Sequence, residues 1–214
     1  MFPSARESDA IVVVIDDDES VREALRGLFQ SVGLVTEIYG SVQECLDAGQ
    51  LDRAGCLVLD IRLPGRSGLE FQEALARSGV AHSVVLISGH VDVQMAVRAM
   101  KAGAIDVLTK PVREQDLLEA VNRALAKDQQ RRAELARDQV LHARYATLSE
   151  RERQVFGLVA AGLLNKQIAE RAAITEATVK LHRSQVMRKM EADTVADLVR
   201  MADRLAKAEA SPEL

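Results

Sequence analysis

The sequence predicts an α/β fold, a doubly wound five-stranded parallel sheet, followed by a smaller all-α domain of four helices. Short β-branched runs alternate with amphipathic segments over residues 11–125, whereas only helical periodicity follows Thr147. Residues 11–125 carry 17 acids and 11 bases, a net charge of −6, and residues 147–190 carry 8 bases and 4 acids, a net charge of +4. An acidic region followed by a basic one indicates two domains with different partners.

Five short apolar runs are the expected strands, because buried parallel strands are rich in β-branched residues. They cover residues 11–15, 34–39, 56–59, 83–87 and 105–108. The expected helices cover residues 20–31, 41–48, 68–77, 92–102 and 113 onward. Ser20 and Ser41 are the expected N-caps of the first two. This alternation predicts parallel strands, with functional groups gathered beyond their carboxyl ends.

The pattern divides the chain into three segments. We expect an α/β domain over residues 10–126, a helical linker over 127–146 and an all-α domain over 147–206. The linker is polar and contains neither Gly nor Pro, so it is expected to extend the last helix of the first domain. The four helices of the last domain are expected at residues 150–161, 165–172, 176–189 and 195–205.

Composition excludes several classes of protein. Apolar residues make up 48% of the chain, but Trp is absent and aromatic residues make up 3%, so the cores are built from aliphatic side chains. No apolar run approaches the roughly 20 residues that span a bilayer. Residues 1–9, expected to be a short disordered arm, do not have the pattern of a secretion signal. Cys45 and Cys56 fit neither a disulfide framework nor a metal site. We therefore expect a cytoplasmic protein without a membrane partner.

Polar side chains follow four of the five expected strands. They are Asp16, Asp17 and Asp18 after the first strand, Asp60 after the third, Ser88 after the fourth and Lys110 after the fifth. Clustered carboxylates repel one another unless a hard cation lies among them, and Mg²⁺ takes a few carboxylates while keeping several waters. A carboxylate beside Mg²⁺ can attack phosphorus, while the metal and a lysine neutralise the phosphoryl oxygens. Asp17 and Asp18 taken alone would also suit a helix N-terminus, but four strand ends together favour a phosphoryl site.

These stretches resemble the response-regulator receiver family, which has a flavodoxin-like doubly wound fold. The matching segments are Val-Ile-Asp16-Asp17-Asp18-Glu-Ser-Val-Arg, Leu-Asp60-Ile-Arg-Leu-Pro64-Gly-Arg-Ser-Gly68, Ile-Ser88-Gly-His and Ala-Met-Lys-Ala-Gly103-Ala-Ile-Asp-Val-Leu-Thr-Lys110-Pro111. The resemblance implies that Asp60 is the phosphoacceptor, Ser88 the switch hydroxyl and Lys110 the phosphate-contacting lysine. It also implies a Mg²⁺ site made by Asp16, Asp17, Asp60 and the backbone carbonyl of Arg62. Arg62 and His90 occupy positions that tune phosphoryl lifetime in such proteins, and the Lys-Pro bond is often cis in them.

One position departs from the receiver pattern. The family usually has Phe or Tyr three residues before the lysine, coupled to the hydroxyl as a rotamer switch, and this chain has Val107. A valine cannot swing a ring into a pocket. The activation signal is therefore expected to travel through the loop after Ser88 and the helix that follows it.

The basic region has the pattern of a helix-turn-helix. Ser149 precedes Glu152 by three residues, as in a capping box. Gly162 is placed to end one helix, Asn165 to cap the next, and Thr175 to cap a helix with a basic face. Two short helices joined by a tight turn, the second one basic, form the geometry that enters the major groove. The pattern alone leaves open a helical bundle with a solvated charged face.

The same region is similar to the LuxR-type helix-turn-helix of the FixJ/NarL class of regulators. The similarity lies in Thr-Leu-Ser-Glu-Arg-Glu from residue 147, Gly-x-x-Asn-Lys-x-Ile-Ala from 162 and Thr-Val-Lys-x-His-Arg from 178. It implies base-edge contacts by Lys180, Leu181 and Ser184. It implies DNA-backbone contacts or supporting roles for Asn165, Lys166, Thr178, His182, Arg183 and Lys189. Ala172 and Ala192 replace the usual Leu and Val, which makes the small core smaller.

Together the two resemblances imply a phosphorylation-dependent transcription regulator of a two-component system, a DNA-binding protein and not an enzyme. A sensor histidine kinase would donate the phosphoryl group to Asp60. The receiver would then form a homodimer through the face around residues 92–109 and place two helix-turn-helix domains on promoter DNA. RNA polymerase is an expected partner, and activation of transcription is the expected outcome.

Two alternatives remain. The run Asp16-Asp17-Asp18 also fits a phosphatase of the haloacid-dehalogenase type with Asp16 as nucleophile. Such an enzyme needs an acidic pair after its lysine, and the nearby acids after Lys110 are Glu114 and Asp116 on an amphipathic helix. In the second alternative the receiver signals by protein contact alone, which the +4 charge of the basic region disfavours.

Overall fold

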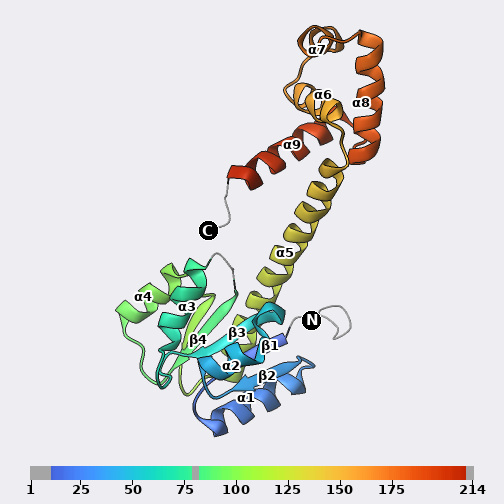
Figure 1. Ribbon diagram of the computed structural model, residues 1–214. Coiled ribbons are helices and arrows are strands. Elements are labelled where there is room, and N and C mark those ends of the chain that lie inside the picture. Colours follow the sequence, from blue (N-terminus) through green and yellow to red (C-terminus); the bar gives the residue numbers. More distant parts are fainter. Residues whose placement is uncertain (1–10, 79–81, 211–214) are drawn as a thin grey trace. The chain divides into compact units, whose positions relative to one another are not determined.

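The computed structural model describes residues 11–78 and 82–210 (Figure 1). They form two compact units, and the division in the sequence falls between Arg132 and Ala133. The predicted disordered arm at residues 1–9 lies outside the described residues. Within the described part of the chain, no helix is both long enough and apolar enough to cross a membrane.

The first unit contains a parallel five-stranded sheet in the order β2-β1-β3-β4-β5, which confirms the predicted fold class. Its strands are β1 (Ile11–Ile15), β2 (Thr36–Tyr39), β3 (Ala54–Asp60), β4 (Val84–Ser88) and β5 (Asp106–Thr109). Its helices are α1 (Glu19–Ser31), α2 (Val42–Ala48), α3 (Gly68–Arg77), α4 (Val93–Lys101) and the first part of α5 (Glu114–Ala146), with a 3₁₀ turn η1 at Leu51–Arg53. Strand β2 begins later than predicted, because the Leu34 amide donates to the Phe29 carbonyl at the end of α1 (3.0 Å).

Successive residues of the central strands enter two different cores, as the alternation of a pleated strand requires. Val13 and Ile15 of β1 pack in a cluster with residues of α2, α3 and α4. Val12 and Val14 pack on the other face with residues of α1 and α5. Both faces of the sheet are therefore covered by helices, and polar groups gather beyond the carboxyl ends of the strands.

Helix starts in this unit agree with the sequence at one predicted cap and differ at the other. The Ser41 hydroxyl accepts from the Glu44 amide at the start of α2 (3.2 Å), which confirms its predicted role. Ser20 was wrongly predicted to cap α1. The cap is Asp18, whose Oδ1 accepts from the Ser20 amide at 2.8 Å. Asp18 is thus bound at the helix N-terminus, where an acid also meets the helix dipole favourably.

Helix α5 continues through residues 127–146, which the sequence predicts to be helical. Asp128, 1% exposed, accepts from Nη2 of Arg131 (2.6 Å) and from Nε of Arg132 (2.5 Å). Nη2 of Arg132 donates to the backbone oxygen of Asp52 in η1 (3.0 Å) and to that of Ala54 at the start of β3 (3.3 Å). The helix therefore stays bound to the first unit as far as Arg132, beyond residue 126, where the sequence places the end of that domain.

The second unit is all-helical. It contains the last part of α5 with α6 (Glu150–Ala160), α7 (Asn165–Ala172), α8 (Glu176–Met190) and α9 (Val195–Ala210). The predicted caps at Ser149, with its capping box, and at Thr175 are confirmed. Asn165 was wrongly predicted to cap α7. It is the first helical residue, and the Leu164 amide before it donates to Oε1 of Gln167 (2.8 Å). Ala172 and Ala192 are both buried in this unit.

Candidate functional site

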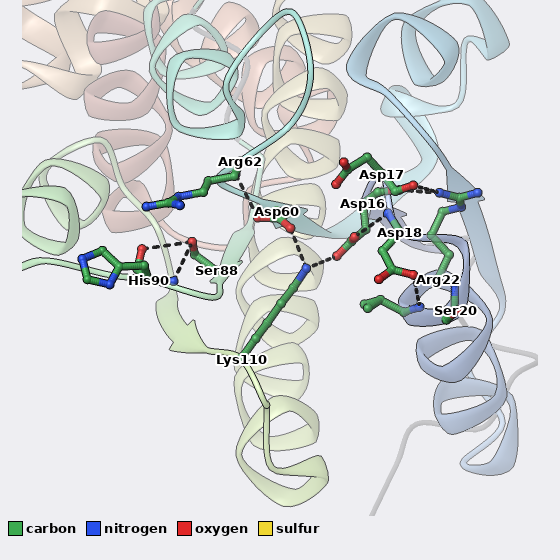
Figure 2. A network of polar contacts seen from close by, with 11 residues as sticks. Asp16, Asp17, Asp18, Ser20, Arg22, Asp60, Arg62, Ser88, His90 and Lys110 are labelled. Atoms are coloured by element: carbon green, nitrogen blue, oxygen red, sulfur yellow. Dashed lines mark hydrogen bonds and ion pairs between the residues drawn. The ribbon is translucent and has the colours of Figure 1, made fainter.

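Three strand ends bring Asp16, Asp60 and Lys110 into one network (Figure 2). Nζ of Lys110 lies 2.6 Å from Oδ2 of Asp16 and 2.5 Å from Oδ2 of Asp60. Asp16 is fully buried and Asp60 is 5% exposed. The lysine therefore compensates two carboxylates that would otherwise be buried charges without a partner. The Lys110–Pro111 bond is cis, as the receiver pattern implies.

Backbone geometry holds both carboxylates in place. Oδ1 of Asp60 accepts from the Arg62 amide at 2.9 Å, and Oδ1 of Asp16 accepts from the Asp18 amide at 3.0 Å. Gly68, the first residue of α3, packs directly against β3. A Cβ at this position would lie 2.0 Å from the backbone oxygen of Asp60, so only glycine permits this approach.

Burial and charge change the ionisation of the network. Burial raises the pKa of Asp16, although the hydrogen bond from Lys110 acts in the opposite direction. Burial alone would lower the pKa of Lys110, but its hydrogen bonds to Asp16 and Asp60 outweigh that effect and raise the pKa. Lys110 is therefore a firmly held cation, placed to contact an anion that arrives at Asp60.

Asp16, Asp17 and Asp60, here called the carboxylate cluster, fit a hard cation. Each offers one oxygen, and the three oxygens lie within 4.8 Å of one another. Asp16 and Asp60 are buried, whereas Asp17 is exposed at the open side. A few carboxylates with room for water are the ligands that Mg²⁺ prefers. The cluster thus contains three of the four residues that the receiver resemblance assigns to the metal site. The fourth is Arg62, whose amide donates to Oδ1 of Asp60.

Ser88 lies at the end of β4, next to the network but not hydrogen-bonded into it. Its hydroxyl donates to the His90 carbonyl (3.1 Å) and accepts from the His90 amide (3.4 Å), and Ser88 is fully buried. The hydroxyl would have to turn away from His90 to reach a group on Asp60. Val107 is half-buried and packs against the same core as Val91 and Met95 of the following loop and helix.

Helix α8 presents an exposed face in the second unit. Lys180, Leu181 and Ser184, the predicted base-edge residues, are all exposed, and Leu181 is 60% exposed. Their spacing places them on one side of the helix. A cation, a large apolar side chain and a hydroxyl in this arrangement match the groups that read base edges in the major groove.

The other predicted DNA-binding residues divide into supporting and exposed groups. Oδ1 of Asn165 accepts from Nη1 of Arg183 at 3.0 Å, which joins α7 to α8. Nζ of Lys189 donates to Oε2 of Glu152 (2.6 Å) and to the backbone oxygen of Thr147, which joins α8 to the start of α6. The Thr178 hydroxyl bonds the capping Thr175 hydroxyl, Lys166 is exposed and His182 is half-buried.

Glu152 is the buried acid of the second unit, at 6% exposed. The Lys189 ammonium, followed by the backbone N–H of Ser149, holds the pKa of Glu152 at about 2, below its ordinary value of 4.5. Glu152 completes a capping box and an ion pair with the same carboxylate. Lys189 therefore helps to fix α8 against the start of α6.

The sequence motifs suggest no role for Arg22 or Gly68, although both lie within matched stretches. Each acts through contact with the backbone of a nearby strand end, which only the folded structure shows. Gly68 is revealed by its approach to the Asp60 carbonyl, and Arg22 by two bonds to the backbone of the Asp16–Asp17 turn. Neither contact leaves a periodic signal in the sequence.

Two family models match the chain. The family described as "Response regulator receiver domain" matches residues 12–122, and the family "Bacterial regulatory proteins, luxR family" matches residues 146–202. Nodulation protein W of Bradyrhizobium diazoefficiens is 48% identical over 92% of this chain and 86% of its own length. Transcriptional regulatory protein FixJ of Azorhizobium caulinodans is 46% identical over 89% of this chain and 90% of its own.

Solved structures agree with these matches. The response regulator StyR is 42% identical, has a TM-score of 0.82 and covers 91% of this chain and 98% of its own. Full-length FixJ from B. japonicum is 36% identical, has a TM-score of 0.55 and covers 94% of this chain and 98% of its own. The likenesses extend over both compact units.

Proposed function

We propose that a phosphoryl group on Asp60 controls DNA binding by this protein. The chain belongs to the response regulators that join a receiver domain to a LuxR-type helix-turn-helix, which are DNA-binding transcription regulators. The observation that carries the proposal is the convergence of Asp16, Asp60 and Lys110 on one network at the strand ends. The proposed division is a receiver at residues 10–126, a helical linker at 127–146 and a DNA-binding domain at 147–206. The matched ranges 12–122 and 146–202 support it.

The proposed reaction is transfer from a phosphohistidine of a sensor histidine kinase. A carboxylate oxygen of Asp60 forms the new P–O bond, while the P–N bond breaks and its electron pair stays on the imidazole nitrogen. Mg²⁺ held by Asp16, Asp17, Asp60 and the Arg62 carbonyl would neutralise phosphoryl oxygens during the transfer. Lys110, already bonded to Asp60 at 2.5 Å, would move its hydrogen bond to a phosphoryl oxygen.

The phosphatase alternative needs an acidic pair after Lys110, and the acids found there do not join the carboxylate cluster. Among the described residues, the acids that approach one another here are Asp16, Asp17 and Asp60, and Glu114 and Asp116 are exposed at the start of α5 outside that group. This arrangement supports Asp60 as the acceptor.

The proposed switch uses the Ser88 hydroxyl. A phosphoryl oxygen on Asp60 would attract this hydroxyl and break its hydrogen bond to the His90 carbonyl. The loop between Ser88 and α4 would then rearrange. Because Val107 cannot act as an aromatic switch, the rearrangement of this loop is proposed as the main route of the signal.

The proposed dimer forms through α4 and β5. Val93, Val97 and Met100 are 80%, 46% and 51% exposed, and their spacing makes one apolar stripe along α4. Burying this stripe against a second copy would remove it from water. Val97→Glu should abolish phosphorylation-dependent dimerisation measured by light scattering. Val35→Glu, a matched change at an exposed valine before β2, should leave dimerisation unchanged.

The proposed output is activation of transcription by a cytoplasmic homodimer on promoter DNA, with RNA polymerase as the partner. Lys180, Leu181 and Ser184 would contact base edges, and Lys166 would contact phosphates. Arg183 and Asn165 would fix α8 against α7 through their hydrogen bond. Thr178 and His182 would support the start and middle of the recognition helix.

Mass spectrometry of the intact protein tests the phosphoacceptor. With acetyl phosphate and Mg²⁺, the wild type and an Asp47→Asn control should each gain one phosphoryl group, whereas Asp60→Asn should gain none. Asp47 is an exposed acid on α2, bonded to Gln43. A phosphoryl group on Asp60→Asn at the wild-type rate would contradict the assignment.

A further inference from the structure

Arg22 is a half-buried cation on α1 beside the carboxylate cluster. Its Nη1 donates to the backbone oxygens of Asp16 (2.7 Å) and Asp17 (2.9 Å). Figure 2 shows Arg22 on the far side of this backbone from Asp60 and Lys110. The guanidinium therefore binds the peptide groups that carry two carboxylates of the cluster, rather than the carboxylates themselves.

The Arg22 guanidinium lies beside Gly40 and Glu44. A Cβ on Gly40, directly after β2, would lie 3.5 Å from Nη1 of Arg22 and 3.3 Å from Oε2 of Glu44. The Gly40 amide donates to the same Glu44 oxygen at 2.7 Å. The ends of β1 and β2 and the start of α2 thus meet around one side chain of α1.

Asp16 and Asp17 depend on this backbone to different degrees. The Asp16 carboxylate is fully buried and is also held by Lys110 and by the Asp18 amide. The Asp17 carboxylate is exposed, and within residues 11–78 and 82–210 no hydrogen bond to it is found. The direction of its Cα–Cβ bond is set by the peptide groups on either side of it, whose oxygens Arg22 binds.

We propose that Arg22 is a positioning residue for cation binding. It fixes the Asp16–Asp17 turn so that the exposed Asp17 carboxylate faces the carboxylates of Asp16 and Asp60. The inference rests on the proposed function, because it takes the cluster to be a Mg²⁺ site. Groups that orient metal ligands from outside the ligand set change metal affinity by roughly 10–100-fold when they are removed. Nη1 supplies two hydrogen bonds from a charged donor, which are stronger than neutral ones.

A second effect of Arg22 has the opposite sign. A positive charge near the cluster repels Mg²⁺ through space, so removing it would tighten binding if charge alone mattered. Arg22 contacts carbonyls on the far side of the turn, and salt screens the part of its charge that faces solvent. Positioning is therefore expected to outweigh repulsion, and the two effects can be separated by the sign of the change.

Calorimetric titration of the full chain with MgCl₂ tests the proposal. Arg22→Met should weaken Mg²⁺ binding by roughly 10-fold, and Arg22→Lys, which keeps the charge but not the planar donor group, should fall between Arg22→Met and wild type. Arg26→Met is the matched control, because Arg26 lies on the same helix and pairs with Glu23. It removes the same charge and should bind Mg²⁺ like wild type.

Two further measurements separate positioning from a general loss of structure. Thermal unfolding without Mg²⁺ should show that the variants are folded. In the acetyl phosphate reaction, Arg22→Met should need more Mg²⁺ for half-maximal rate but approach the wild-type rate at saturation. Equal or tighter Mg²⁺ binding by Arg22→Met would overturn the role of Arg22. If Arg22→Met does not fold, Arg22→Lys decides, and binding equal to wild type overturns the role. A wild type that binds no Mg²⁺ would overturn the cation site itself, and this inference with it.

Discussion

The receiver site takes Asp16, Asp60 and Lys110 from strand ends that are far apart in the chain, whereas the exposed face of α8 belongs to one helix. Lys110 is 94 residues from Asp16 and 50 residues from Asp60, yet it bonds both. Lys180, Leu181 and Ser184 are neighbours on one helix surface. Changes to the packing that brings these strand ends together should therefore lower the stability of the α/β fold, while changes on the α8 face should alter DNA binding and leave stability nearly constant.

The two tyrosines allow this difference to be measured in the full chain, because one lies in each unit. A Tyr145→Phe background leaves the buried Tyr39 to report unfolding of the receiver. A Tyr39→Phe background leaves Tyr145, which packs against Phe156, to report the DNA-binding domain.

Gly68→Ala should have the largest effect. Its Cβ would lie 2.0 Å from the Asp60 carbonyl oxygen, and backbone cannot yield as a side chain can. The receiver should lose more than about 3 kcal/mol, the upper end of ordinary overpacking, as measured by urea unfolding followed at Tyr39. Gly27→Ala is the control. Gly27 lies in α1 with no heavy atom near the added carbon, so this change should stabilise by up to about 1 kcal/mol. Equal stability of the two variants would show that β3 and α3 do not pack as described.

Asp128→Ala should come second. The carboxylate is buried and bonded by the half-buried Arg131 and Arg132, so its removal takes the ion-pair partner from both guanidinium groups and should cost about 3 kcal/mol in the receiver transition. Asp138→Ala, on the same helix, breaks an exposed pair with Arg204 and should cost less than about 1 kcal/mol. Similar losses in the two variants would mean that α5 is not bound to the receiver through Asp128.

Acid should weaken the DNA-binding domain through Glu152. The folded-state pKa of about 2 is below the ordinary 4.5, so this carboxylate contributes stability above pH 4.5 and loses it as the pH falls from 4.5 toward 2. Glu152→Gln keeps a capping side chain but removes the charge that pairs with Lys189. The variant should lose roughly 2 kcal/mol at neutral pH, the range for hydrogen bonds to a charged group, and its Tyr145 transition should depend less on pH over that window. An unchanged pH dependence would show that Glu152 is not paired in the folded protein.

Lys180→Ala should have the smallest effect on stability, within about 0.5 kcal/mol. Its DNA binding should nevertheless weaken, with about 1–3 kcal/mol of lost discrimination at one base pair if Lys180 contacts a base edge. Competition titrations with single-base variants of a bound duplex measure this loss. Lys207→Ala, an exposed lysine of α9, should retain full discrimination. A uniform loss over all duplexes would instead assign Lys180 to a phosphate.

The folds of both units could be predicted because their signals are local and repeated. Alternating β-branched runs and helix caps such as Ser41, Ser149 and Thr175 are read from neighbouring residues. The same local rules failed where two candidates compete. Asp18 lies just before Ser20 and caps α1 in its place, and Gln167 satisfies the amide of Leu164, so Asn165 is not needed as a cap.

The contacts that no local rule predicts join distant parts of the chain. The sequence ends the receiver near residue 126 because the chain becomes polar there, yet Asp128 is buried through its arginine partners. Lys189 is a cation on the basic helix, which suggests a DNA contact. Its ion pair with Glu152 could not be predicted, because Glu152 is 37 residues away in the sequence. The meeting of Asp16, Asp60 and Lys110 could be predicted, because the carboxyl ends of parallel strands lie at one edge of the sheet. The bond from the Ser88 hydroxyl to His90 could not, because it depends on a loop conformation.

Control of DNA binding by Asp60 is tested by a DNA-binding titration of wild type, Asp60→Asn and the Asp47→Asn control, each with and without acetyl phosphate and Mg²⁺. The duplex would be one selected from a random pool by phosphorylated wild type. The donor should tighten binding by wild type and Asp47→Asn and leave Asp60→Asn unchanged. Equal binding by all three proteins under both conditions would show that a phosphoryl group on Asp60 does not control DNA binding.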